Sequence, residues 1–199
     1  GIIATMLLGV ILFYIDGKPV HAAVLYLASV LVKPQSGLLA PLALAAFIKA
    51  LTVMPWKKIL STIALTFSIG VALYLVVVLP FYTPTSSAAV LPVWLDPFWW
   101  LLDLYLTSAQ DYPYGSANAY NLWFLLGGQI LPNTTVRLWI SDATWGFALL
   151  APFALWTLYL YLRKKPYPSV EASLIHASWI IVFAAFTIMT KMHERYLVT

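Results

Sequence analysis

A lysine stands beside a proline within an apolar stretch, in the tripeptide Lys33-Pro34-Gln35. Proline disfavours helical geometry in the residue before it and cannot donate a backbone hydrogen bond, so the tripeptide interrupts any helix there. Broken backbone at membrane depth is tolerated only inside protein or beside a wet cavity. Lys33, Gln35 and Ser36 therefore offer hydrogen-bond donors to such a cavity. The alternative is a lysine that snorkels to the membrane surface beside a structural kink.

A second polar cluster, Lys191-Met-His-Glu-Arg-Tyr196, follows the last long apolar segment. If the helix continues through it, Lys191 and Arg195 lie four residues apart on one face. Together with His193 they could bind a phosphate, for which arginine provides a fork of donors and lysine a point charge. A solvated helix end, in which Lys191 pairs with Glu194, explains the same residues as well.

A third polar pair, Asn118 and Asn121, lies in a segment rich in tryptophan and tyrosine. Each side-chain amide both donates and accepts hydrogen bonds, which suits the hydroxyl groups of a sugar. Helix capping or hydrogen bonding within a loop is the simpler explanation. The chain has no cysteine and no histidine cluster with the spacing of metal ligands. Nothing in it therefore predicts a metal site or a cofactor, and a divalent metal has no support.

The composition fixes the class of protein that must position these groups. Hydrophobic residues make up 62% of the 199 residues and charged residues 9%, whereas globular chains carry about 25% charged residues. So few charges could not cover the surface of a soluble domain, and the composition predicts an integral membrane protein. The same figures exclude a disordered chain, a collagen-like chain and a DNA-binding domain.

Membrane spans of about 20 apolar residues are the expected building blocks. Three segments reach that length: Ile59–Leu79, Ala143–Leu162 and Ser169–Met189. Gly1–Ile15 is typical of the end of another span. Val20–Val32 and Gly37–Ile48 are shorter, and we expect them to form a hairpin that turns at the Lys33 break. The sequence thus predicts an all-α, polytopic transmembrane bundle in which residues 1–199 form a single domain, as part of a longer chain.

Lysine and arginine set the expected orientation. One set of loops holds seven of them: Lys18, Lys49, Lys57, Lys58, Arg163, Lys164 and Lys165. The long connection 80–142 holds Arg137 against four aspartates. The basic loops therefore belong on the inner side and the long connection on the outer side of a multi-pass protein, for which we expect a prokaryotic plasma membrane. The net charge of +4 is then a topology signal and predicts no nucleic-acid partner, since the bilayer is the expected partner.

The outer connection is expected to contain interfacial helices. Asp96 is followed by a proline, which is a helix-start signal, and polar residues recur on one face through Gln110. This segment is typical of an amphipathic helix that lies on the bilayer. Asp111–Gly115 is typical of a turn. Ser116 is then placed to cap a second short helix, Ala117–Leu126, which ends at two glycines.

Three motifs occur in a fixed order: Lys33-Pro34-Gln35 before an apolar helix with Pro41, Asn118-Ala-Tyr-Asn-Leu-Trp123, and Lys191-Met-His-Glu-Arg-Tyr-Leu197. In this order and at these separations they resemble bacterial and archaeal relatives of the second mannosyltransferase of glycosylphosphatidylinositol synthesis. Those relatives belong to the GT-C class of membrane glycosyltransferases. The resemblance covers essentially the whole chain and corresponds to the middle and C-terminal part of the family.

The resemblance implies a GT-C-like helical fold and transfer of a sugar, expected to be mannose, from a polyprenyl- or dolichyl-phosphate donor on the outer side of the membrane. In such enzymes an acceptor hydroxyl attacks the anomeric carbon while a carboxylate takes its proton. Cationic groups stabilise the lipid phosphate as it leaves. The residues that fit this phosphate-binding role are Lys33, Gln35, Lys191, His193 and Arg195.

The two asparagines, Asn118 and Asn121, fit contacts to the sugar or within the loop. The catalytic aspartate that is usual in the class lies in the first outer loop, which we expect upstream of Gly1, so the catalytic residue stays unassigned. Asp111, in the turn between the two short helices, is the nearest local substitute.

Three other functions fit the same residues. A non-enzymatic subunit of a larger membrane complex, or a transporter of lipid-linked glycans, would also retain the embedded lysine and the outer helices. A transporter should show paired broken helices in two halves, and the sequence shows one break. Ligation of undecaprenyl-linked glycans would use the same side of the membrane and the same kind of lipid.

Overall fold

The fold is almost entirely helical. A computed structural model describes residues 2–83, 95–108, 114–117, 121–128, 130–163, 169–190 and 192–193. Within these residues, helices alternate with short connections, and each strand is two residues long. The prediction of an all-α chain is confirmed.

Four segments of the described chain are helices long and apolar enough to cross a membrane: Pro34–Thr52, Trp56–Phe81, Asp142–Leu162 and Val170–Ile188. The last three match the predicted spans to within a few residues. The first joins a 3₁₀ helix, η1 (Pro34–Leu39), to α3 (Ala40–Thr52). It corrects the expectation of a short arm over Gly37–Ile48, because Pro34 begins a helix as well as ending one.

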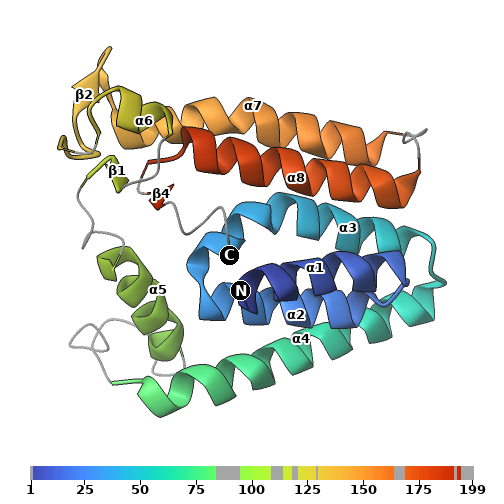
Figure 1. Cartoon of the computed structure of the whole chain (residues 1–199). Coiled ribbons are helices and arrows are strands. Elements are labelled where there is room, and N and C mark those ends of the chain that lie inside the picture. Colours follow the sequence, from blue (N-terminus) through green and yellow to red (C-terminus); the bar gives the residue numbers. More distant parts are fainter. Residues whose placement is uncertain are drawn as a thin grey trace.

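The long helices lie side by side (Figure 1). Besides α3 they are α1 (Ile2–Ile15), α2 (Pro19–Val32), α4 (Trp56–Val78) with η2 (Leu79–Phe81), α7 (Asp142–Leu162) and α8 (Val170–Ile188). The hairpin of α7 and α8 packs on the group α1–α4, with α3 against α7 and η1 against α8. The core at this contact includes Leu39, Leu42, Ala46, Leu174, Ala177 and Ile181. Its alanines let helix backbones approach closely.

The helix break at Lys33 is present. Lys33 is extended, with φ −150° and ψ 108°, and its N–H donates to the Ser29 carbonyl at 2.9 Å. Pro34 starts η1, and the Ser36 N–H donates back to the Lys33 carbonyl at 3.0 Å. The Tyr26 hydroxyl holds the break by donating to the Ser36 carbonyl at 3.0 Å. The chain reverses direction here, so the predicted hairpin is confirmed.

The two ends of the bundle differ in content (Figure 1). The connections α1–α2, α3–α4 and α7–α8 lie at one end, which we call the lysine-rich end; the described basic residues of these connections and the adjacent helix turns are Lys18, Lys49, Lys57, Lys58 and Arg163. The other end, which we call the cap end, holds the Lys33 break, α5 (Asp96–Ser108), α6 (Leu122–Leu125) and the described strands. The predicted spans likewise place the basic loops at one end of the bundle and the long connection at the other. Which side of a membrane each end faces stays a prediction.

The helix α5 lies across the cap end, transverse to the bundle (Figure 1). Tyr74 on α4 stacks on Phe98, with ring centroids 4.3 Å apart, and its hydroxyl donates to the Pro97 carbonyl at 2.6 Å. The helix begins at Asp96, as predicted. Asp96 is fully buried, however, and does not share an exposed polar face with Asp103. The predicted end of this helix falls outside the described residues.

The second predicted helix of the outer connection starts later than expected. Ser116 and Ala117 form β1 instead of a helix, and α6 is four residues long. Asn121, not Ser116, caps α6, because its Oδ1 accepts a hydrogen bond from the Phe124 N–H at 3.2 Å. Ser116 is drawn out of the helix because β1 pairs in parallel with β4 (Met192–His193).

A hairpin that the sequence does not predict precedes α7. Its strands are β2 (Val136–Arg137) and β3 (Ile140–Ser141), which pair antiparallel. The turn residues Leu138 and Trp139 have φ values of 48° and 73°. Two-residue turns with positive φ favour Asn-Gly, so two large apolar residues give no turn signal at these positions.

Candidate functional site

The segment after the first motif, Asn121 of the second motif and two residues of the third motif lie near the C-terminal end of α8. This helix ends at Ile188, and Met189 is extended, with φ −73° and ψ 145°. Met192 and His193 form β4, so the helix continuation on which a shared face of Lys191 and Arg195 would depend does not occur. Lys191 and Arg195 lie outside the described residues, and so does the side chain of His193.

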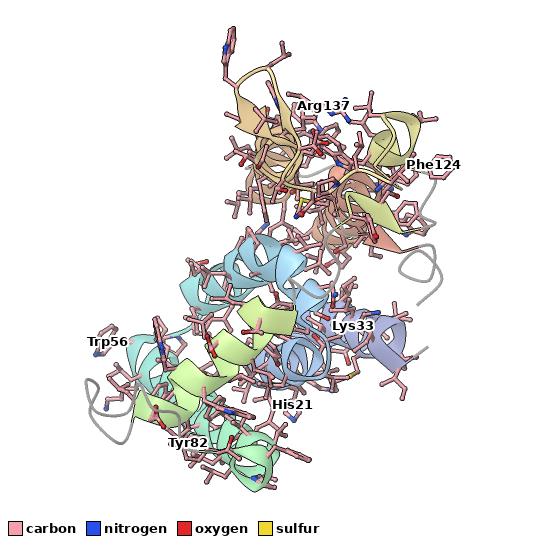
Figure 2. All side chains as sticks on the ribbon, turned by 90° about the vertical axis from the view of Figure 1, so that its left-hand side faces the viewer. His21, Lys33, Trp56, Tyr82, Phe124 and Arg137 are labelled. Carbon is pink, nitrogen blue, oxygen red and sulfur yellow. The ribbon has the colours of Figure 1, made fainter. Side chains whose placement is uncertain are left out.

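The 3₁₀ helix η1, which follows Lys33, connects the first motif to α8. Leu38 on η1 packs against the apolar cluster formed by Leu150, Ala184, Ala185 and Met189. Ser36 is 4% exposed, and its Oγ has no hydrogen-bond partner among the residues that the structure describes. Lys33 is half-buried and Gln35 is exposed at the cap end, the face that Figure 2 presents to the viewer. Ser36 therefore lies on η1, the element that packs against α8, and Lys33 lies directly before this element.

Asn121 connects the second motif to the C-terminal end of α8. Asn121 is 3% exposed, and its Nδ2 donates to the carbonyls of Met189, at 3.1 Å, and Phe186, at 3.3 Å. Its Oδ1 caps α6 through the Phe124 N–H. The amide thus donates and accepts within the protein. Of the two roles predicted for it, contacts within the loop are the one that these bonds fulfil.

A tryptophan and two glycines fix the same junction. Trp123 is 2% exposed, and its indole N–H donates to the Ile188 carbonyl. A Cβ on Gly128 would lie 2.7 Å from the Trp123 carbonyl oxygen, so the loop after α6 can fold back only onto glycine. A Cβ on Gly146 of α7 would lie 3.3 Å from the Ile188 carbonyl oxygen. The sequence signals helix ends at glycine, but it does not signal these close approaches.

The strands bring the second and third motifs together directly. Ser116 pairs with Met192 and Ala117 pairs with His193. The strand β1 ends one residue before Asn118, which lies outside the described residues. Backbone pairing therefore places Ser116 and Ala117, which precede the asparagine motif, beside Met192 and His193 of the C-terminal motif.

A buried ion pair also holds the cap end. Asp142 at the start of α7 is fully buried, and the Nε of Arg137 donates to its two carboxylate oxygens at 2.9 and 3.2 Å. The Nη2 of Arg137 donates to the Leu126 carbonyl at 2.7 Å, and the Trp145 indole donates to the Arg137 carbonyl at 2.8 Å. Arg137 therefore links the β2–β3 hairpin, the loop after α6 and α7, and it balances the charge of Asp142.

A second buried carboxylate, Asp96, lies at the start of α5. Its Oδ2 accepts a hydrogen bond from the Tyr82 hydroxyl. That bond, followed by burial and by the charge of Asp96, raises the pKa of Tyr82 to about 12. Figure 2 shows Tyr82 on the opposite side of the helix group from Lys33. This pair therefore ties η2 to α5 and is not part of the junction at α8.

Sequence reasoning missed the burial of both carboxylates. The available signals were that Asp96 precedes a proline and that Asp142 follows Ser141, each at the start of a helix. The predicted substitute Asp111 lies outside the described residues. In the part of the chain that the structure describes, no group of three or more His, Asp or Glu residues could hold a metal ion.

The fold and these contacts define a helical bundle with membrane-length helices and a polar cap at one end. Comparisons of the chain with protein family models, with curated proteins and with solved structures find no match. Any conclusion about function must therefore rest on the residues of the cap end.

Proposed function

We propose that the chain works as part of a membrane glycosyltransferase that moves a sugar, mannose in the first instance, from a polyprenyl- or dolichyl-phosphate donor to an acceptor at the cap end. The observation that supports this is the proximity of η1, Asn121 and the backbone of β4, far apart in sequence, near the end of α8. Leu38 packs on the apolar cluster that includes Met189, Asn121 donates to the Met189 carbonyl, and β1 pairs with β4. The resemblance to GT-C enzymes assigns residues of all three motifs to one substrate, so we expect these motifs to lie close together.

The lipid phosphate is the group that the cap end suits best. Lys33 supplies an ammonium group, which acts on phosphate as a point charge. Gln35, exposed two residues further on, supplies a side-chain N–H donor. Pairing of β1 with β4 holds the backbone of His193 beside Ala117 at the cap end. As the sugar–phosphate bond breaks, negative charge grows on the phosphate, and cations that are already in place lower the barrier.

The transfer needs a base as well as a phosphate site. The acceptor oxygen forms a bond to the anomeric carbon, the bond from that carbon to the phosphate oxygen breaks, and the acceptor proton passes to a carboxylate. Asp96 and Asp142 do not suit this task, because both are fully buried and already bonded to Tyr82 and Arg137. Asp111 stays the local candidate, and an upstream aspartate stays the one that the resemblance implies.

The polyprenyl chain needs an apolar surface beside the phosphate site. The helix α5 leaves five large apolar side chains exposed at the cap end: Phe98, Trp99, Leu102, Leu104 and Leu106. A transverse helix with such a surface is suited to the boundary between headgroups and acyl chains. The donor lipid can therefore lie along α5 while its phosphate reaches Lys33.

The test compares two lysines of this chain. Membranes that contain the chain are given polyprenyl-phosphate mannose with a radiolabelled sugar, and loss of donor and labelled product are measured. Lys33→Ala should lower the rate about 10- to 100-fold, since a hydrogen bond to a charged group contributes about 1.5–3 kcal/mol. Lys57→Ala, an exposed lysine of the lysine-rich end, is the matched control and should leave the rate unchanged.

Two outcomes decide against the proposal. Equal rates for the two alanine variants would remove Lys33 from the phosphate site. A wild-type rate equal to that of membranes without the chain would favour the alternative of a non-enzymatic subunit. Arg195→Ala, in the third motif, should behave like Lys33→Ala, because both are assigned to the same leaving phosphate.

A further inference from the structure

A groove with a volume of about 670 Å³ runs along the seam between α2 and α4, from the lysine-rich end to Ala28 on α2 and Leu73 on α4. Apolar side chains of both helices form its walls, among them Val24, Leu25, Ala28, Leu65, Ile69 and Leu73. Thr62 also lines it, but its hydroxyl donates to the Sδ of Met54 at 3.8 Å. The walls therefore suit an apolar ligand.

The rim of the groove at the lysine-rich end is basic. Lys18, His21 and Lys58 line it there, and Figure 2 shows His21 where α2 and α4 meet. Lys18 forms an exposed ion pair with Asp16 at 3.2 Å. Lys58 forms no ion pair with any residue that the structure describes. The rim thus keeps a net positive charge, and Lys58 is its cation without a carboxylate partner.

The length of the groove fits a lipid chain. On α4 it is lined from Lys58 to Leu73, fifteen residues that rise about 22 Å along the helix. One leaflet contributes about half of the roughly 30 Å hydrocarbon core. A chain that starts at the basic rim and follows α4 would therefore reach through one leaflet and remain in contact with the apolar walls.

We propose that this groove binds an anionic phospholipid, with one acyl chain between α2 and α4 and the phosphate beside Lys58 and Lys18. A phosphodiester and its acyl chain bring the negative charge and the apolar length in one molecule, which is what the rim and the walls together require. Basic pockets between membrane helices bind anionic headgroups in this way. The site lies at the opposite end of the bundle from the cap end and does not depend on the proposed glycosyltransferase.

Native mass spectrometry of the purified full chain tests the site with two defined lipids. Phosphatidylglycerol and phosphatidylcholine with identical acyl chains are added in turn to the chain in detergent micelles. We expect one phosphatidylglycerol to bind at least fivefold more tightly than phosphatidylcholine. Lys58→Ala should remove most of this preference, whereas Lys57→Ala, one residue away and not on the groove, should keep it.

A second pair of variants tests the walls. Leu65→Trp fills the groove and should remove the tightly bound lipid, whereas Leu60→Trp, on the same helix but not on the groove, should not. Equal affinities for the two lipids, or equal losses in Lys57→Ala and Lys58→Ala, would overturn the proposal. It would also be overturned if the wild-type chain formed a dimer that Leu65→Trp abolished, since a second copy would then occupy the groove.

Discussion

The ion pairs at the two ends of the bundle differ in how deeply they are buried. At the lysine-rich end, Lys18 and Asp16 form an ion pair whose side chains are 53% and 55% exposed. At the cap end, Arg137 pairs with Asp142, whose side chain is 0% exposed. The two pairs have similar N–O distances, 3.2 and 2.9 Å. Burial, not distance, is what separates them.

This difference indicates that polar contacts stabilise the cap end more than the lysine-rich end. Exposed ion pairs contribute about 0–1 kcal/mol, so the lysine-rich end can keep its charges for topology and for lipid contacts. A buried carboxylate that loses its partner leaves an uncompensated charge. The cap end is therefore held by its polar residues, and changes to them should affect both its stability and the site.

The largest expected effect comes from breaking the buried pair. Arg137→Met should lower the free energy of unfolding by about 3 kcal/mol, because Asp142 is left buried without its cation. Lys18→Met, at the exposed pair, should change it by less than about 1 kcal/mol. Thermal unfolding of the chain in detergent measures both. Equal losses in the two variants would mean that the two ends do not differ as described.

The next largest loss of stability is expected from a change at the C-terminal end of α8, and a change at its N-terminal end is the control. Asn121→Asp keeps a cap for α6 but places a carboxylate against the carbonyls of Met189 and Phe186, and should cost about 2 kcal/mol. Ser169 caps the other end of α8 by accepting a hydrogen bond from the Ala172 N–H at 3.1 Å. Ser169→Asn should be nearly neutral, because asparagine caps as well as serine. The same unfolding measurement distinguishes them, and a neutral Asn121→Asp would argue against the junction.

A smaller effect should appear at the turns. Gly17 takes a φ of 69° at the lysine-rich end, where glycine adopts it without strain, whereas Leu138 and Trp139 take positive φ at the cap end. Replacing the latter two by asparagine and glycine should raise stability by about 1 kcal/mol. Gly17→Ala should lower it by a similar amount. A loss of stability in the double variant would show that these apolar side chains, 73% and 92% exposed, make contacts that outweigh the strain.

The smallest expected effect on stability comes from the hydrogen bond between Tyr82 and Asp96, and its pH dependence is visible only at high pH. The folded pKa of Tyr82 is raised to about 12 from an ordinary value near 10. The stabilisation from its bond to Asp96 should be fully present below pH 10 and disappear as the pH rises through 12. The difference in melting temperature between the wild type and Tyr82→Phe should therefore shrink across this window. A constant difference from pH 9 to pH 12 would contradict the assignment.

The bundle could be predicted from sequence because its helices are long and their apolar runs are local features. Ile59–Leu79 and Ser169–Met189 each predict a helix found within a few residues of those bounds. The cap end could not be predicted, because its structure depends on partners distant in sequence. The pairing of Ser116 with Met192 removes Ser116 from the helix it would cap. The burial of Asp142 likewise depends on the turn at Leu138, which has no sequence signal.

The candidate site was predicted in part for the same reason. The break at Lys33 is a local consequence of Pro34, so both its position and its hairpin follow from the sequence. The role of Asn121 does not, because its side chain contacts carbonyls at the end of a helix that begins 49 residues later. Spacing would place Lys191 and Arg195 on one face if the helix continued, but α8 ends at Ile188, and Met192 and His193 pair with β1.

The most direct test of the cap end as a lipid-phosphate site is equilibrium binding of polyprenyl phosphate, without a sugar, to the chain in phosphatidylcholine nanodiscs. Lys33→Ala should weaken binding about tenfold, the loss expected for one hydrogen bond to a charged group. Lys57→Ala, an exposed lysine of the other end that does not line the groove, should leave it unchanged. Equal binding by the wild type and Lys33→Ala, or a loss in Lys57→Ala alone, would contradict the placement of the phosphate at the cap end.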